Sequence, residues 1–112
     1  MSIATLVLRW DSTDASKSGW RVKINGLIYS QREDFKKRFP KVKEEDPNGV
    51  TLVINPEDEP AFDRNNPFDM PMYVVIQYLK VLGDMRYKVV TSHSTAAPDN
   101  THSMTMWTLQ SK

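Results

Sequence analysis

Residues 69–90, "DMPMYVVIQYLKVLGDMRYKVV", decide the fold, because they place an apolar helix directly before a strand. Asp69 and Pro71 are typical of a helix start, and Gly83 is typical of a helix end. A strand-like run of apolar residues then begins at Tyr87. The stretch therefore predicts a helix that leads into a strand through a short connection.

The predicted helix has two apolar stripes and almost no polar side. At about 100° per residue, the first stripe has the spacing of a core-facing surface and consists of Met72, Val75, Ile76, Leu79 and Leu82. The second stripe consists of Val74, Tyr78 and Val81. A helix on one sheet needs one stripe, so we expect a cover for the second because exposed apolar patches are unfavourable. The cover is either the loop with Phe62 and Phe68 or another subunit, unless the second stripe is simply exposed.

The remaining chain alternates between strand-like and helix-like patterns. Period-two alternation predicts strands at residues 3–10, 20–24, 50–54, 87–93 and 103–110. Asn25-Gly26 predicts a tight turn, after which residues 27–30 can add a short strand. Phe35 and Phe39, four positions apart, give one apolar side to a helix that Pro40 ends.

This order of elements predicts an α+β fold, with a single antiparallel sheet of five to six strands and two helices packed on one face. The length of 112 residues fits one domain that spans residues 1–112. Several prolines fall within and around residues 55–69, which we interpret as a loop insert at the surface.

The composition excludes several classes of protein. Fifteen basic and fourteen acidic residues give a formal net charge of +1, far from the basic excess of most nucleic-acid-binding proteins. The absence of cysteine excludes disulfides and thiolate metal sites, and it fits the cytosol. No stretch approaches the roughly 20 apolar residues of a membrane span. We therefore expect a soluble cytoplasmic protein without nucleic-acid or membrane partners.

The sequence contains little that catalysis requires. His93 and His102, the two histidines, lack a third clustered ligand for a metal, although they could face each other across a hairpin. Glu57, Asp58 and Glu59 are consecutive and cannot all converge on one cation, so we interpret them as solvated loop charges. The four glycines exclude a glycine-rich phosphate loop, and no G-x-S-x-G or H-E-x-x-H pattern occurs. We expect neither an enzyme nor a bound cofactor or metal.

Two other features are compatible with binding. The run "KKRFPKVK" at residues 36–43 resembles an anion-binding patch or a nuclear-import signal, but the acids that start at Glu44 neutralise much of it. Trp10, Trp20 and Trp107 all lie in predicted strands. They either pack in the core or line an interface or a ligand shelf.

The order of these elements resembles that of the GTP cyclohydrolase I feedback regulatory protein family. The matching stretches are "TLVLRW", "WRVKINGLIY", "REDFKKRF", "PMYVVIQYLKVLGDMRYKVVT" and "MTMWTL", which together cover most of the chain. The anchor residues are Arg21, Pro71, Tyr87, Val89 and Trp107. The chain departs from the family in its insert at residues 55–69, in its longer connection at residues 94–103, and in the "NTHSM" that replaces a short glycine and glutamine turn.

The resemblance implies a non-catalytic regulatory protein that binds GTP cyclohydrolase I and mediates its feedback inhibition by tetrahydrobiopterin and its stimulation by phenylalanine. It also implies a homo-oligomer, a ring of five subunits, that docks on the enzyme with these effectors at the interface. On this basis we expect an effector- or partner-binding site at Trp20, Arg21, His102 and Ser103. We also expect subunit contacts at Val74, Tyr78 and Val81.

Two other interpretations stay open. The chain could be a small monomeric α+β domain that binds a metabolite or a peptide. It could also be a small enzyme that uses His93 or His102 as a general base.

Overall fold

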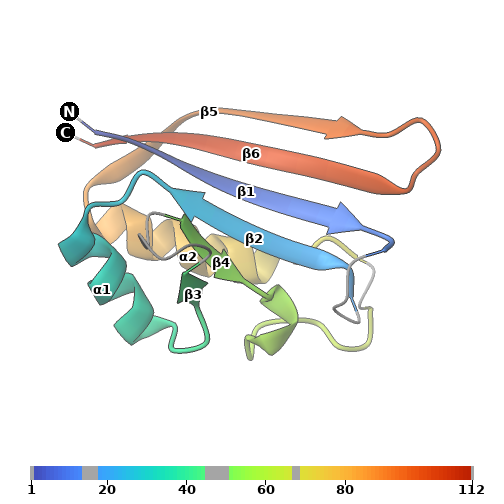
Figure 1. Ribbon diagram of the computed structural model, residues 1–112, viewed down its shortest axis with the longest axis horizontal. Coiled ribbons are helices and arrows are strands. Elements are labelled where there is room, and N and C mark those ends of the chain that lie inside the picture. The colour runs from blue at the N-terminus through green and yellow to red at the C-terminus, as the bar shows by residue number, and fades with distance from the viewer. Residues whose placement is uncertain (1, 14–17, 45–50, 67–68, 112) are drawn as a thin grey trace.

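The structure, a computed structural model, describes residues 2–13, 18–44, 51–66 and 69–111. A single antiparallel sheet has six strands in the order β3-β4-β2-β1-β6-β5 (Figure 1). The strands are β1 (Ile3–Asp11), β2 (Trp20–Asn25), β3 (Lys43–Glu44), β4 (Thr51–Ile54), β5 (Tyr87–Ala96) and β6 (His102–Ser111). The helices are α1 (Tyr29–Arg38), the short 3-10 helix η1 (Pro56–Asp58) and α2 (Met72–Asp84). The predicted α+β class, with one antiparallel sheet and two α-helices, is confirmed.

The core lies on one face of the sheet and follows from the alternation along each strand. Ala4, Leu6 and Leu8 of β1 are buried, and the residues between them are only half-buried. The neighbouring strands continue this buried row with Val22, Ile24, Leu52, Ile54 and Leu109. Both α-helices cover this face, so the opposite face of the sheet carries no helix.

Helix α2 presents a different arc to the core than the sequence pattern predicts. Its buried residues are Val74, Val75, Tyr78 and Leu82. At about 100° per residue these four fall within a single arc of roughly 100°. Met72 and Ile76, which we predicted to face the sheet, are exposed by 36% and 42%. The predicted stripe is therefore correct for Val75 and Leu82 and wrong for Met72 and Ile76, because the buried arc of α2 is turned towards Val74 and Tyr78.

The second stripe is covered within the chain, and helix α1 covers its Tyr78. The Tyr78 ring lies 5.8 Å from the ring of Phe35 and 4.8 Å from that of Phe39, measured between centroids. Val74 and Tyr78 have no exposed surface, and Val81 is partly buried against the same core. The prediction that Val74 and Tyr78 form subunit contacts is therefore wrong, because both side chains are fully buried within this chain's own core.

Several boundaries differ from the sequence pattern. The predicted short strand at residues 27–30 is wrong, because Tyr29 already belongs to α1, and the sixth strand of the sheet is β3. The predicted insert contains η1 and contributes the buried side chains of Glu59 and Phe62. Phe68, one of the two aromatic residues of the loop that we considered as a cover for α2, lies outside the described residues.

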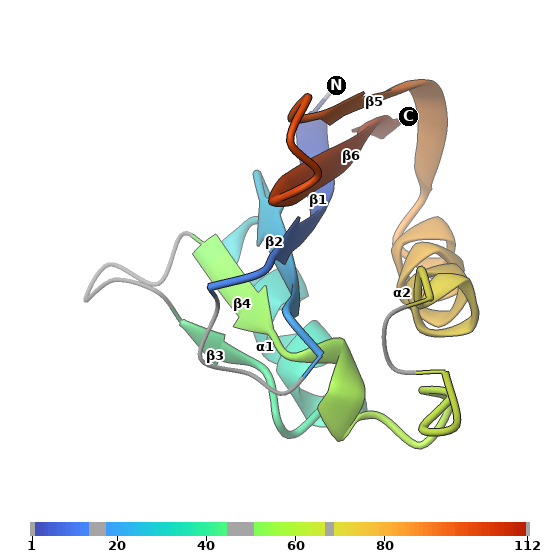
Figure 2. The same cartoon turned by 90° about the vertical axis from the view of Figure 1, so that its right-hand side faces the viewer.

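Strands β5 and β6 form a long hairpin that the helices leave largely uncovered. Figure 2 shows the two strands at one end of the curved sheet, with α1 near the other end. Only Tyr87 of β5 is buried. The pairing of β5 with β6 shifts register between Val89 and Thr91, so Val90 forms a β-bulge. Strand β5 is thus stabilised mainly by its backbone pairing with β6 and little by burial of its side chains.

The two ends of the chain meet at one place. The Ser2 amide donates a hydrogen bond to Ser111 Oγ at 2.9 Å, and the Ser111 amide donates to the Ser2 carbonyl at 2.9 Å. Both ends lie at the opposite end of the sheet from the β5–β6 turn (Figure 1).

Gly26 has the closest backbone contact of the described glycines, and it yields a stability prediction. Its φ angle is +95°, and a Cβ there would overlap the Ile3 carbonyl oxygen and lie 2.9 Å from Ala4 Cα. We expect Gly26→Ala to lower the free energy of unfolding by about 1–3 kcal/mol, measured by urea denaturation. The control is Gly83→Ala on α2, where no atom lies within 4 Å of the new Cβ. The control should gain about 0.5–1 kcal/mol, and a Gly26→Ala protein as stable as the parent would contradict the prediction.

A buried carboxyl group lies beside the aromatic cluster. Glu59 is only 7% exposed, and its burial raises its pKa. Burial and then the charge of Glu59 raise the pKa of Tyr78. Within residues 2–13, 18–44, 51–66 and 69–111, the Tyr78 hydroxyl has no partner with good hydrogen-bond geometry, so neither group fully compensates the desolvation of the other.

This arrangement predicts that the contribution of Glu59 to stability falls as pH rises. The pKa of Glu59 in the folded state is higher than its ordinary value of 4.5. The stability that Glu59 contributes is therefore fully present below pH 4.5 and is lost as pH rises through the folded-state pKa. We expect Glu59→Gln to be more stable than the parent at pH 7, with a difference that shrinks towards pH 4.5. Urea denaturation across this range measures the effect. Asp58→Asn, an exposed neighbour, is the control; equal pH profiles for the parent and Glu59→Gln would overturn the explanation.

Candidate functional site

A pocket lined by two tryptophans lies where β1 and β2 meet the turn of the β5–β6 hairpin. Its volume is about 340 Å³, within the range of roughly 300–1,000 Å³ that is common for small-molecule sites. We call it the tryptophan pocket, and its lining residues are Trp10, Trp20, Ala96, Asn100, His102 and Ser103. A second, smaller pocket is described at the end of this subsection.

Strand register brings the lining residues together. Trp10 pairs with Trp20 of β2 on one side and with Ser103 of β6 on the other. Ala96 of β5 in turn pairs with Ser103. These residues continue the row of Leu8 and Val22, because side chains on paired positions point to the same face. The tryptophan pocket therefore extends the core face of the sheet beyond the helices.

The two indole rings differ in their hydrogen bonding. Their centroids are 6.5 Å apart at an interplanar angle of 53°. Trp10 Nε1 donates to the Ser18 carbonyl at 3.1 Å. Trp20 is 7% exposed, and its Nε1 has no acceptor within the part of the chain that the structure describes. A buried indole N–H without an acceptor is costly, so a ligand that supplies one would gain affinity here.

Hydrogen bonds fix the polar rim of the pocket. The Ser12 amide donates to the Thr101 carbonyl at 2.9 Å, which ties the end of β1 to the hairpin turn. Asp99 Oδ1 accepts from Thr101 Oγ1 at 2.7 Å, and this hydroxyl lies 3.1 Å from His102 Nδ1. The hydrogen bonds from Thr101 and the nearby His102 lower the pKa of Asp99. The rim is thus an ordered polar edge around an aromatic floor.

A close backbone approach also shapes the floor. Gly19 has a φ angle of +79°, and a Cβ there would lie 2.8 Å from both Trp10 Nε1 and the Asp11 carbonyl oxygen. A side chain at this position would push the Trp10 ring from its place beside Ser18.

The structure brings three of the four predicted effector-site residues into this one pocket. Trp20, His102 and Ser103 line it together, although about eighty positions separate the first from the others. Arg21 does not line it, because it follows Trp20 on a strand and points to the opposite face, where it pairs with Arg9. Sequence reasoning missed Ala96 and Asn100, and it saw Trp10 only as a strand tryptophan.

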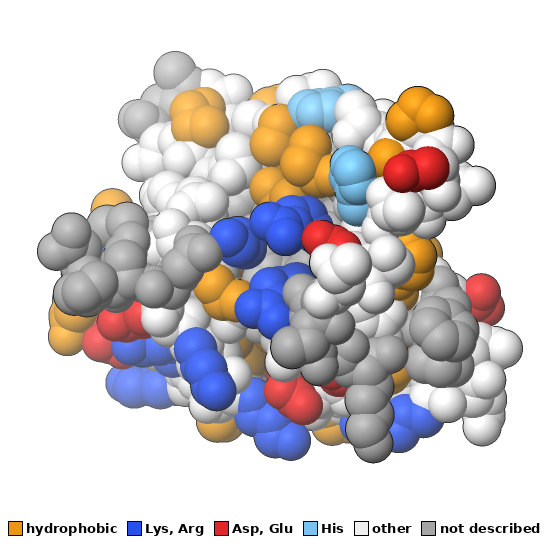
Figure 3. Space-filling model, turned by 45° about the vertical axis from the view of Figure 1, so that its right-hand side comes forward, with side chains coloured by type: hydrophobic (Ala, Val, Ile, Leu, Met, Phe, Trp, Pro, Cys, Tyr) orange, Lys and Arg blue, Asp and Glu red, His pale blue; other side chains and the backbone are white. Residues whose placement is uncertain are grey.

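The helix-free face of the sheet is cationic near its middle. Register places Arg9, Arg21 and Lys23 there, with Met104 and Met106 on the adjoining strand. Figure 3 shows Lys and Arg side chains gathered below a group of hydrophobic side chains and near the two histidines. By register His102 belongs to this face, and it also lines the tryptophan pocket.

The histidines do not form a pair. His93 pairs with Met106 across the hairpin, whereas His102 pairs with Asp11 of β1. The expectation that they could face each other is wrong, because the hairpin turn is shorter than predicted. Among the described residues, no group of three or more His, Asp or Glu side chains could hold a metal ion.

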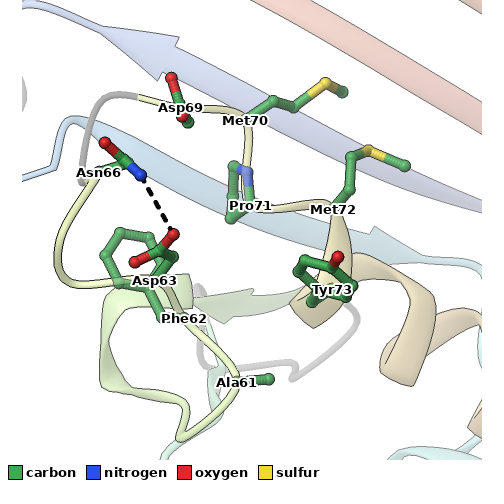
Figure 4. A pocket seen from close by; sticks show the side chains of 9 residues that line it. All are labelled: Ala61, Phe62, Asp63, Asn66, Asp69, Met70, Pro71, Met72 and Tyr73. Carbon is green, nitrogen blue, oxygen red and sulfur yellow. Dashed lines mark hydrogen bonds between the residues drawn. The ribbon is translucent and has the colours of Figure 1, made fainter.

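A second, smaller pocket lies between the loop after η1 and the start of α2 (Figure 4). Its volume is about 130 Å³, below the usual range for small-molecule sites. Asn66 Nδ2 donates to Asp63 Oδ2 at 3.3 Å on one wall. Met70 and Met72 point to the same side of the other wall. Its size and its lack of a buried unpaired polar group make it the weaker candidate.

Comparisons with known proteins show the fold and no more. No protein-family model and no curated protein matches the chain. The crystal structure of a conserved kinetoplastid-specific protein from Trypanosoma cruzi is similar over 100% of both chains, with a TM-score of 0.67 and 12% sequence identity. At this identity the likeness is one of architecture. None of the described helices is long and apolar enough to span a bilayer.

Proposed function

We propose that this chain is a non-catalytic binding protein whose ligand site is the tryptophan pocket. In its specific form, the proposal is a cytoplasmic regulator that binds GTP cyclohydrolase I and responds to phenylalanine and tetrahydrobiopterin. The general part is supported by the geometry of the pocket. The specific part is supported by the resemblance of the sequence to that regulatory family.

The observation that carries the proposal is the convergence of Trp20, His102 and Ser103 on one pocket of about 340 Å³. Two tilted indole rings favour a planar apolar group, which can pack against both faces. The unpaired Trp20 N–H favours a ligand with an acceptor such as a carboxylate. An aromatic amino acid or a pterin combines these properties.

Regulation would follow from linkage between two binding events. A protein that binds one state of an enzyme better shifts the enzyme towards that state. An effector held where the two proteins meet strengthens this bias, and the enzyme in turn strengthens effector binding. The pocket opens at the end of the sheet beside the hairpin turn, a position from which a ligand could contact a docked partner.

A monomeric domain that binds a metabolite or peptide is the second candidate. The burial of Val74 and Tyr78 favours it, because the helix surface that we expected to hold subunits together is part of the core. This candidate uses the same tryptophan pocket and needs no enzyme partner.

The ligand site is tested by thermal shift and calorimetry with phenylalanine, other amino acids and pterins. We expect at least one of these to stabilise the protein and Trp20→Phe to weaken its binding by roughly tenfold, because the variant loses the indole donor. Trp107→Phe is the matched control, since Trp107 is half-buried in β6 and does not line the pocket. If no compound binds, or if both variants lose affinity equally, the pocket is not the ligand site.

The partner is tested by pull-down of GTP cyclohydrolase I with and without phenylalanine. Retention that increases with phenylalanine, and that Trp20→Phe abolishes, supports the regulator. Direct ligand binding without any retention of the enzyme supports the monomeric binding domain and refutes the specific form.

A further inference from the structure

The two outer strands of the sheet are very different. At one side, β3 has two residues, Lys43 and Glu44. At the other side, β5 has ten residues, of which all nine from Lys88 to Ala96 are exposed. Figures 1 and 2 both show β5 along the margin of the sheet with no described element beyond it. The exposed margin of the sheet is therefore concentrated on β5.

An open outer strand presents unpaired backbone N–H and C=O groups that can pair with another strand. Proteins usually block such strands by making them short, by placing charges on them or by bulges. Strand β3 is both short and charged. Strand β5 has its bulge at Val90, close to its start, which leaves the segment Thr91–Ala96 regular and open. This segment contains no Lys, Arg, Asp or Glu.

We propose that residues 91–95 of β5 pair antiparallel with the same residues of a second copy of the chain, around a two-fold axis. Side chains of both copies stay on matching faces when the axis passes between one residue and the same residue of the second copy. The bulge at one end of the segment and the end of β5 at the other place this residue near His93. Thr91 then lies opposite Thr95 of the second copy. The only permanent charge on β5, Lys88, falls outside the paired segment, so no like charges oppose each other.

The side chains favour an identical strand over a foreign peptide. Peptides that add to a sheet gain affinity from the backbone and specificity from pockets for alternate side chains. The segment 91–96 carries mostly small hydroxyl side chains, which are β-compatible and compact enough to lie opposite themselves. The same strand also exposes Val89 and Val90 by 41% and 52%, and a second copy would shield them in part.

The inference does not rest on the proposed function. It gives a closed assembly of two subunits, which differs from the ring of five implied by the family resemblance. It also places the second copy beside the tryptophan pocket, because Ala96, which lines the pocket, directly follows the paired segment on β5.

Cysteine cross-linking tests the pairing directly, because the natural chain has no cysteine. Opposite residues of an antiparallel pair have Cα atoms roughly 4.5–5.5 Å apart, which suits a disulfide. Under mild oxidation His93→Cys should form a covalent dimer much faster than Ser30→Cys, an exposed control at the start of α1. Equal rates for the two variants would refute the pairing.

Analytical ultracentrifugation of the cysteine-free chain tests the same assembly without cross-linking. We expect a dimer at micromolar concentration, and roughly tenfold or weaker dimerisation for Thr91→Lys with Thr95→Lys, since lysines on an outer strand oppose pairing. Ser30→Lys with Gln77→Lys adds the same charge on the helices and should remain dimeric. Circular dichroism verifies that both double variants are folded. A monomeric parent, a five-membered assembly, or a lysine variant of β5 that dimerises like the parent overturns the proposal.

Discussion

The contact of Tyr78 with Phe35 and Phe39 is the interaction on which the rest of the structure depends. It joins the middle of α2 to α1 through rings 5.8 Å and 4.8 Å apart, the second in an edge-to-face arrangement. Aromatic pairs of this kind contribute about 0.5–1.5 kcal/mol each beyond the burial of their surface. The two helices and the inner strands contribute their buried side chains to one core on the same face of the sheet. The hairpin of β5 and β6 is left without a helix.

This incomplete cover creates the features that matter for binding. The core row of β1 continues past the end of the helices into Trp10 and Trp20, where the hairpin turn supplies a polar rim. The outer side of the same hairpin is open along β5. Ala96 belongs both to the pocket lining and to the open strand β5, so a shift of this strand would move part of the pocket lining.

Local patterns predicted the fold class well and the packing less well. Alternation in β1 and β2 was sufficient to place both strands, and the Asn25-Gly26 turn follows from the positive φ of Gly26. The orientation of α2 could not be obtained in the same way, because both of its stripes have helical spacing and only the position of α1 decides between them. The burial of Glu59 was also hidden, since three consecutive acids in a proline-rich loop usually mean solvated charge.

The site was predicted in part. Trp20, His102 and Ser103 were proposed by resemblance, and the register of three strands shows that they are neighbours. Asn100 and Ala96 could not be assigned to the pocket from the sequence, because their positions depend on the length of the hairpin turn, which composition does not specify. Arg21 was assigned to the same site because it adjoins Trp20 in sequence, yet neighbouring residues of a strand point to opposite faces.

The meeting of the two chain ends has a consequence for architecture and for experiments. Since Ser2 and Ser111 are hydrogen-bonded to each other, any polypeptide joined at both ends would enter and leave the domain at a single point. The fold is thus suited to insertion into a surface loop of a host protein, or to circular permutation with a short linker. Labels or surface tethers attached at that point would stand at the far end of the sheet from the indole rings and leave their environment undisturbed.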